Sequence, residues 1–204
     1  ALRQCAHVDL PREFDPEVLP KALNAKLPLD IAVHSARAVD DEFHARFSAT
    51  GKRYVYRCWV DRMRPVHGRA YCAWIRVPLH LEKMRDAARF LVGEHDFAAF
   101  ATNPGYERTR GTVRRIDHLH LTRRAKGFDL AVQGNGFLYN MVRTIVGTLV
   151  WVGKGKLTPG EVREILDGRD RRAAGPNAPP HGLFLQRVLY GPLKSTAEPL
   201  SLVT

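Results

Sequence analysis

A strict alternation of side chains marks the segment from Lys52 to Val60. One face of this segment would carry Tyr54, Tyr56 and Cys58, and the other Arg53, Val55, Arg57 and Trp59. Successive side chains of a β-strand point to opposite faces of a sheet. The pattern therefore predicts a strand with two aromatic rings on one face and two guanidinium groups on the other.

Helical spacing replaces this alternation further along the chain. Apolar residues recur every three or four positions from Leu81 to Val92, and Gly93 suits the residue just after a helix. The stretch Leu138–Val152 is almost wholly apolar, which predicts a helix buried in the core.

Capping signals predict two more helices. Thr158 and Glu161 have the spacing of a capping box, so we expect a helix that begins there and ends at Gly168. Residues 15–25 begin with an Asp-Pro pair, which suits the N-cap and first position of a short helix.

Further strands are expected where apolar runs are bounded by turn residues. They are Leu2–Leu10, Ile31–Val39, Ala70–Val77, Thr112–Thr122, Phe128–Gln133 and Leu183–Tyr190. Strands and helices then follow one another in a β-α-β-β order that occurs twice. This order favours an α+β fold with mixed sheets over a parallel α/β fold.

The same order suggests where domains begin and end. We predict a partial N-terminal α+β half at 1–64, a C-terminal α+β half at 65–192 and a loose tail at 193–204. The chain opens without methionine and directly in a strand-like segment, so we interpret it as a fragment.

The net charge of the chain narrows the class of molecule that it is expected to bind. The 204 residues include 32 lysines and arginines against 21 acids, which gives a net charge of +11. Such a surface favours a polyanion, because neutralising phosphates releases their condensed counterions. A basic surface without a nucleic-acid partner is the plain alternative.

Cysteine usage and hydropathy exclude other classes. The three cysteines are widely spaced and form no CxxC pair, which argues against both a zinc site and a disulfide framework. No apolar run is long enough to span a membrane. We expect reduced thiols in a cytosolic protein.

Cations and aromatic rings are interleaved between Asp40 and Tyr54. Aromatic side chains stack on unpaired bases and arginines hold phosphates, so this segment is a candidate RNA contact. The alternative is a loop that Phe43 and Phe47 pin to the core.

One cation, Arg143, lies inside the apolar helix predicted at 138–152. A buried guanidinium without a partner is costly, so a carboxylate or a phosphate is expected near it. A structural ion pair would satisfy Arg143 as well as a functional one would. His118 and His120 alternate on a predicted strand, and we interpret them as a surface pair without a metal.

Five segments taken together resemble the tRNA pseudouridine synthase A family over Leu2 to about Tyr190. They are FHARFSAT–KRY–Y at 43–56, GEHDF at 93–97, RT at 108–109, NGFLYNMVRxIVG at 135–147 and AP–GLxL at 178–185. Each is moderately specific, and their order and spacing together are strongly specific.

The resemblance implies a fold and a reaction. Members of this family have two similar α+β halves with a basic cleft between them, and they act as homodimers in the cytoplasm without cofactor or metal. They convert uridines around positions 38–40, in the anticodon stem-loop of tRNA, to pseudouridine. The glycosidic bond breaks, the uracil turns, and its C5 rejoins the sugar.

The resemblance also implies roles for individual residues. Tyr54 matches the active-site tyrosine that packs against the target base, Arg143 the arginine that pairs with the catalytic aspartate, and Leu183 the apolar wall of the uracil pocket. The tRNA-contacting positions are Phe43, His44, Ala45, Arg46, Phe47, Lys52, Arg53, Arg108 and Thr109.

The family's essential aspartate lies in a G-R-T-D-x-G-V-H-A motif that this sequence does not contain. We therefore expect that aspartate upstream of Ala1, and a chain that is silent on its own. Two rival interpretations remain: an RNA-binding module without catalysis, and another basic RNA-associated protein such as a ribosomal component.

Overall fold

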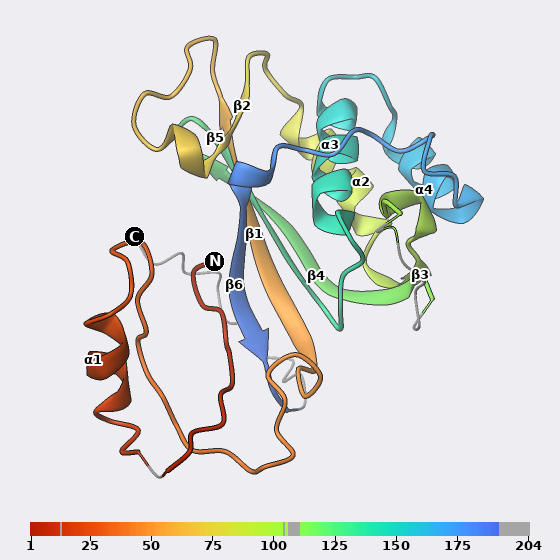
Figure 1. The fold of residues 1–204 in the computed structure, drawn as a ribbon. Coiled ribbons are helices and arrows are strands. Elements are labelled where there is room, and N and C mark those ends of the chain that lie inside the picture. The colour runs from red at the N-terminus through yellow and green to blue at the C-terminus, as the bar shows by residue number, and fades with distance from the viewer. Residues whose placement is uncertain (13, 104, 106–110, 192–204) are drawn as a thin grey trace. The chain divides into compact units, whose positions relative to one another are not determined.

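The structure is a computed structural model that describes residues 1–12, 14–103, 105 and 111–191. It divides into two compact units, and both are drawn in Figure 1. Unit 1 comprises Ala1–Gln4 and Thr50–Thr204, and unit 2 comprises Cys5–Ala49.

Unit 1 is built on one sheet. Its strands are β1 Gly51–Val60, β2 Ala73–Ile75, β3 Gly93–Asp96, β4 Val113–Arg124, β5 Gly127–Gly134 and β6 Leu183–Leu189. The order across the sheet is β2-β1-β5-β4-β3, and β6 pairs with β1. The β1–β2 pair is parallel and the others are antiparallel, so the sheet is mixed.

Three helices cover one face of this sheet in Figure 1: α2 Leu81–Arg89, α3 Met141–Gly153 and α4 Pro159–Gly168. Single 3-10 turns lie at η1 Arg69–Tyr71, η2 Ala98–Phe100 and η3 Pro180–Gly182. The core forms between the helices and the sheet. Its largest fully buried side chains include Tyr56, Phe97, Phe100 and Phe128.

The predicted α+β class with a mixed sheet is confirmed. The strand predicted at 52–60, the hairpin of β4 and β5, and the helices α2 and α4 occur where the patterns placed them. The capping box is also present, because the Thr158 hydroxyl accepts from the Glu161 N–H while the Glu161 carboxylate accepts from the Thr158 N–H.

Two strand predictions were wrong. Residues 2–10 and 31–39 form no strand in the described chain. The N–H groups of Leu2 and Arg3 reach the Leu185 carbonyl, and Val33 bonds through both its N–H and its carbonyl to the Asn24 side chain. An apolar run becomes a strand only when another strand takes its backbone groups.

Other boundaries shift. The helix predicted at 15–25 is α1 Leu19–Asn24, in unit 2. The Asp15 carboxylate accepts from the Glu17 N–H, which makes a turn before the helix rather than a helix cap. The strand predicted at 70–77 is reduced to β2 by the turn η1, and β3 lies where only the end of a helix was expected.

The predicted boundary between residues 64 and 65 stays a prediction. Within unit 1, β1 pairs with β5 and β6, so strands assigned to the two predicted halves share one sheet. In unit 2, Ala45 is buried, and no other described residue from Cys5 to Ala49 is. No helix among the described residues is long and apolar enough to cross a membrane.

Candidate active site

Tyr54 lies on β1 opposite Val132 of β5 and Leu185 of β6. Its partly buried ring packs against the core and meets the Phe137 ring edge-on, with centroids 5.3 Å apart at 87°. Burial raises the pKa of the Tyr54 phenol above its usual value. The phenol is therefore neutral at physiological pH, so Tyr54 offers a flat ring and a hydroxyl rather than a phenolate.

Tyr56, two residues further along β1, is fully buried. Its hydroxyl donates to the Pro179 carbonyl at 2.7 Å. Burial and, less strongly, Cys58 raise the pKa of this phenol, while the positive charge of Arg143 lowers it in part. The positive charge of Arg143 therefore acts on the Tyr56 phenol.

Arg143 occupies the first turn of α3. Its Nε donates to the Ala178 carbonyl at 2.6 Å, and its Nη1 donates to the Asn140 Oδ1 at 2.8 Å. Both acceptors are neutral. Among residues 1–12, 14–103, 105 and 111–191, no carboxylate forms an ion pair with this guanidinium. The side chain is therefore held in place with its full charge uncompensated.

A network of hydrogen bonds fixes Asn140, whose side chain accepts from Arg143. Asn140 has a left-handed backbone, with φ of 61°, and its Nδ2 donates to Thr102 Oγ1 at 3.3 Å. Thr102 Oγ1 also accepts from Asn177 Nδ2 at 3.3 Å, and Asn177 Oδ1 accepts from Thr144 Oγ1 at 2.7 Å. Asparagine tolerates the left-handed region better than most residues, which lets this side chain face the guanidinium.

The segment from Ala173 to Gly182 runs directly against α3. A Cβ on Gly147 would lie 1.7 Å from the Pro176 carbonyl oxygen, so only glycine permits this approach. The close approach brings the Ala178 carbonyl to Arg143. Leu183 directly follows this segment and pairs with Tyr56 across the β1–β6 ladder.

Tyr56 is therefore the structural centre of the predicted site. Its hydroxyl bonds to Pro179, next to the Ala178 carbonyl that holds Arg143; its strand carries Tyr54, and its ladder partner is Leu183. Tyr54 and Leu183 both pack against the same core cluster. The arrangement offers an aromatic ring, an apolar side chain and a positioned cation, which suit a flat uncharged base beside an anion.

The residues predicted to contact RNA fall into both units. Lys52 and Arg53 lie on β1, and Arg53 Nε donates to the buried Gln133 at 2.8 Å. The guanidinium of Arg53 is therefore tied to the sheet by at least one bond. Arg108 and Thr109 lie outside the described residues.

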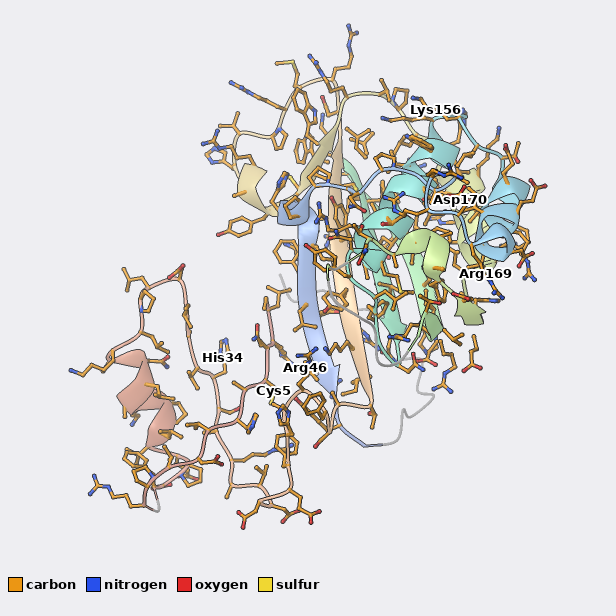
Figure 2. The ribbon with its side chains drawn as sticks, turned by 45° about the vertical axis from the view of Figure 1, so that its right-hand side comes forward. Cys5, His34, Arg46, Lys156, Arg169 and Asp170 are labelled. Atoms are coloured by element: carbon orange, nitrogen blue, oxygen red, sulfur yellow. The ribbon has the colours of Figure 1, made fainter. Side chains whose placement is uncertain are left out.

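In unit 2, residues 43–48 form a tight turn. The His44 ring accepts from the backbone N–H groups of Arg46 and Phe47 and lies 4.3 Å from the Phe47 ring. Arg46, labelled in Figure 2, places its guanidinium 5.6 Å from the same ring. Phe47 is 63% exposed, whereas Ala45 is buried and Phe43 is half-buried. The turn presents a ring and a cation together.

Sequence patterns missed three residues of the site. Tyr56 looked like one member of an alternating strand, Asn140 lay inside the helix predicted at 138–152, and Asn177 carried no signal of its own. The available signals were an asparagine three residues before an arginine in an apolar helix, and a segment rich in glycine and proline that contains Asn177. His118 and His120 are exposed on β4, and no three potential ligands gather for a metal in the described part of the chain.

The fold and this site define a basic α+β protein with a cation poised for an anionic group. The family model described as tRNA pseudouridine synthase matches residues 87–191. The tRNA pseudouridine synthase A of Bacillus velezensis is 45% identical over 190 residues, which are 93% of this chain and 76% of that protein. The corresponding enzyme of Chlamydia trachomatis is 43% identical over 93% of this chain and 71% of its own length.

The chain belongs to the tRNA pseudouridine synthase family. It is therefore related to isomerases that make pseudouridine in tRNA. The relative from Bacillus subtilis, 44% identical over 190 residues, gives the same result.

Proposed function

We propose that this chain supplies the tyrosine, arginine and leucine of an active site that converts uridine to pseudouridine in the anticodon stem-loop of tRNA. The protein would act as a cytoplasmic homodimer without cofactor. A catalytic aspartate, absent from this sequence as a family motif, would come from chain outside it. The 204 residues alone would then be catalytically silent.

The observation that carries this proposal is that Arg143 is held by hydrogen bonds while its charge is not neutralised. Neutral acceptors hold its Nε and Nη1, and no described carboxylate compensates its charge. A catalytic carboxylate that docks against such a guanidinium gains a charge-assisted bond without breaking an existing ion pair. The bond would keep that carboxylate ionised and oriented.

Each remaining side chain has a part in the isomerisation. The neutral Tyr54 ring would pack against the extruded uracil, and Leu183 would close the other side. The reaction breaks the bond between the sugar C1′ and N1, forms a bond from C1′ to C5, and moves the C5 hydrogen to solvent while N1 gains a proton. Tyr54 would assist that late proton transfer.

Extrusion of the uridine from the stem costs a few kcal/mol. The exposed Arg46 and Phe47 of unit 2, with Lys52 and Arg53 of unit 1, would offset that cost through phosphate and base contacts. Arg108 and Thr109 would add to these contacts.

The test compares this chain with a version extended upstream through the aspartate motif. Release of the C5 hydrogen from tRNA labelled at uridine C5 measures turnover. We expect the extended chain to be active and the 204-residue chain to be silent. In the extended chain, Tyr54→Ala and Arg143→Ala should each abolish most turnover.

Arg163→Ala is the matched control, because Arg163 is an exposed helical arginine already paired with Asp167 at 2.8 Å. It should retain activity. Wild-type turnover by the Tyr54→Ala, Arg143→Ala double variant would refute the site assignment. An extended chain that binds tRNA without turnover would support an RNA-binding module instead.

A further inference from the structure

The segment between β1 and the end of β2 carries an unusual concentration of charge. Residues 62–76, called here the basic segment, contain four arginines, one histidine and no acid. In Figure 1 it is the gold loop that follows β1 and leads into β2 and the residue after it.

Three arginines of the basic segment can pair their charge with an incoming anion. Arg62, Arg64 and Arg69 are exposed, and their side chains form no ion pair or hydrogen bond with the described residues. The acid just before the segment, Asp61, pairs with Lys126 instead, and this contact lowers the pKa of Asp61. Asp61 therefore neutralises Lys126 rather than the arginines.

Large apolar and aromatic side chains lie among these cations. Met63 is 75% exposed, Val66 76% and Tyr71 61%, and Trp74 is exposed with the Arg76 guanidinium 5.0 Å from its ring. Cations interleaved with exposed rings are the composition by which proteins hold phosphates and unpaired bases together.

The basic segment is held in shape before any partner binds. The Trp59 Nε1 donates to the Met63 carbonyl at 3.1 Å, and the Trp74 Nε1 donates to the Asp61 carbonyl at 2.9 Å. The Met63 N–H donates to the Asp61 carboxylate at 2.8 Å. A preformed loop loses little conformational entropy when it binds.

The basic segment contacts the strand that carries Leu183. The Tyr71 ring lies 6.2 Å from the Phe184 ring, and Phe184 directly follows Leu183. The Arg57 guanidinium of β1 lies 5.0 Å from the same Phe184 ring. Successive side chains of a strand point to opposite faces of a sheet, so Tyr71 and Arg57 contact β6 on the face opposite to Leu183.

We infer that the basic segment is a second RNA-binding surface, which binds the phosphates and an exposed base of the tRNA outside the uridine pocket. This inference rests on the proposed function, since it assumes that tRNA is the substrate. It adds Arg62, Arg64, Arg69 and Tyr71 to the contacts expected from residues 43–53 and 108–109.

The experiment measures binding of an unmodified tRNA transcript to the chain across a range of salt concentrations. The test variant is R62Q/R64Q/R69Q. The matched control, R89Q/R163Q/R172Q, also removes three charges from exposed arginines, but these lie beside Asp86, Asp167 and Asp170. Both variants should unfold like the wild type, because none of the six side chains is buried.

We expect the test variant to bind tRNA at least about tenfold more weakly at low salt and to lower the slope of log K against log salt by about 2 to 3. The control should change the slope by less than about 1. Equal slopes for both variants, or an unchanged test variant, would overturn the inference. A changed oligomeric state with unchanged tRNA binding would assign the surface to a protein partner.

Failure of the proposed function gives a different result. In that case the wild-type chain itself would not prefer the tRNA transcript over duplex DNA of equal length. The second surface is supported if the wild type prefers tRNA and only the test variant loses affinity for it.

Discussion

Adding one methyl group at Gly182 should destabilise unit 1 measurably. A Cβ at this position would lie 2.8 Å from Cζ of Tyr56 and 2.9 Å from the Arg57 carbonyl oxygen. The backbone of Gly182 is outside the left-handed region, so the contact alone causes the strain. Tyr56 cannot turn away, because it is fully buried and its hydroxyl is bonded to Pro179.

The magnitude follows from the cost of overpacking. One extra methyl group in a close-packed core costs about 1–3 kcal/mol. Replacing glycine also restricts the unfolded chain, which returns about 0.4–1 kcal/mol. The net loss should be about 1–2 kcal/mol, and a domain of this size then melts roughly 2–8 °C lower.

Tryptophan fluorescence is the suitable assay. All three tryptophans, Trp59, Trp74 and Trp151, lie in unit 1, so their emission follows the unfolding of that unit. Gly160→Ala is the control, since Gly160 lies in α4 with no atom within 4 Å of the new Cβ. It should raise the free energy of unfolding by up to about 1 kcal/mol. The reasoning fails if Gly182→Ala melts at or above the wild-type temperature.

Two further predictions use the same assay. Thr158→Ala should cost about 1 kcal/mol, because the Glu161 N–H loses the Thr158 hydroxyl as its acceptor, whereas Thr158→Ser should cost much less; equal losses would contradict the cap. Burial raises the pKa of Tyr56, so the stability it contributes is complete below about pH 10 and is lost as the pH rises further. As the pH rises above about 10, the free energy of unfolding of Tyr56→Phe should therefore fall less than that of the wild type. Parallel curves of this free energy against pH would refute the prediction.

The sequence was sufficient wherever a segment carries its own signal. The alternation in β1, the periodicity of α2 and the capping box of α4 are local patterns that fix the local structure. The family motifs also predict the correct family, because their order and spacing along the chain are specific even where each motif alone is not.

The failures share a physical cause. Residues 2–10 and 31–39 have strand-like composition but no strand to pair with in the described chain, and β3 forms because β4 pairs with it. Partner identity is a long-range property that composition does not encode. For the same reason, the sequence did not predict the contacts of Tyr56 with Pro179 and Leu183. Both contacts depend on β6 and the segment before it lying against β1.

The placement of Arg143 has a consequence for how the site can work. If an internal carboxylate already paired with Arg143, an incoming anion would have to displace it, and the exchange would gain little. Neutral acceptors fix the direction of the guanidinium without cancelling its charge. The network through Asn140, Thr102 and Asn177 then sets where an anion can bind. An anion that binds to Arg143 would be aligned by hydrogen bonds that exist before it arrives.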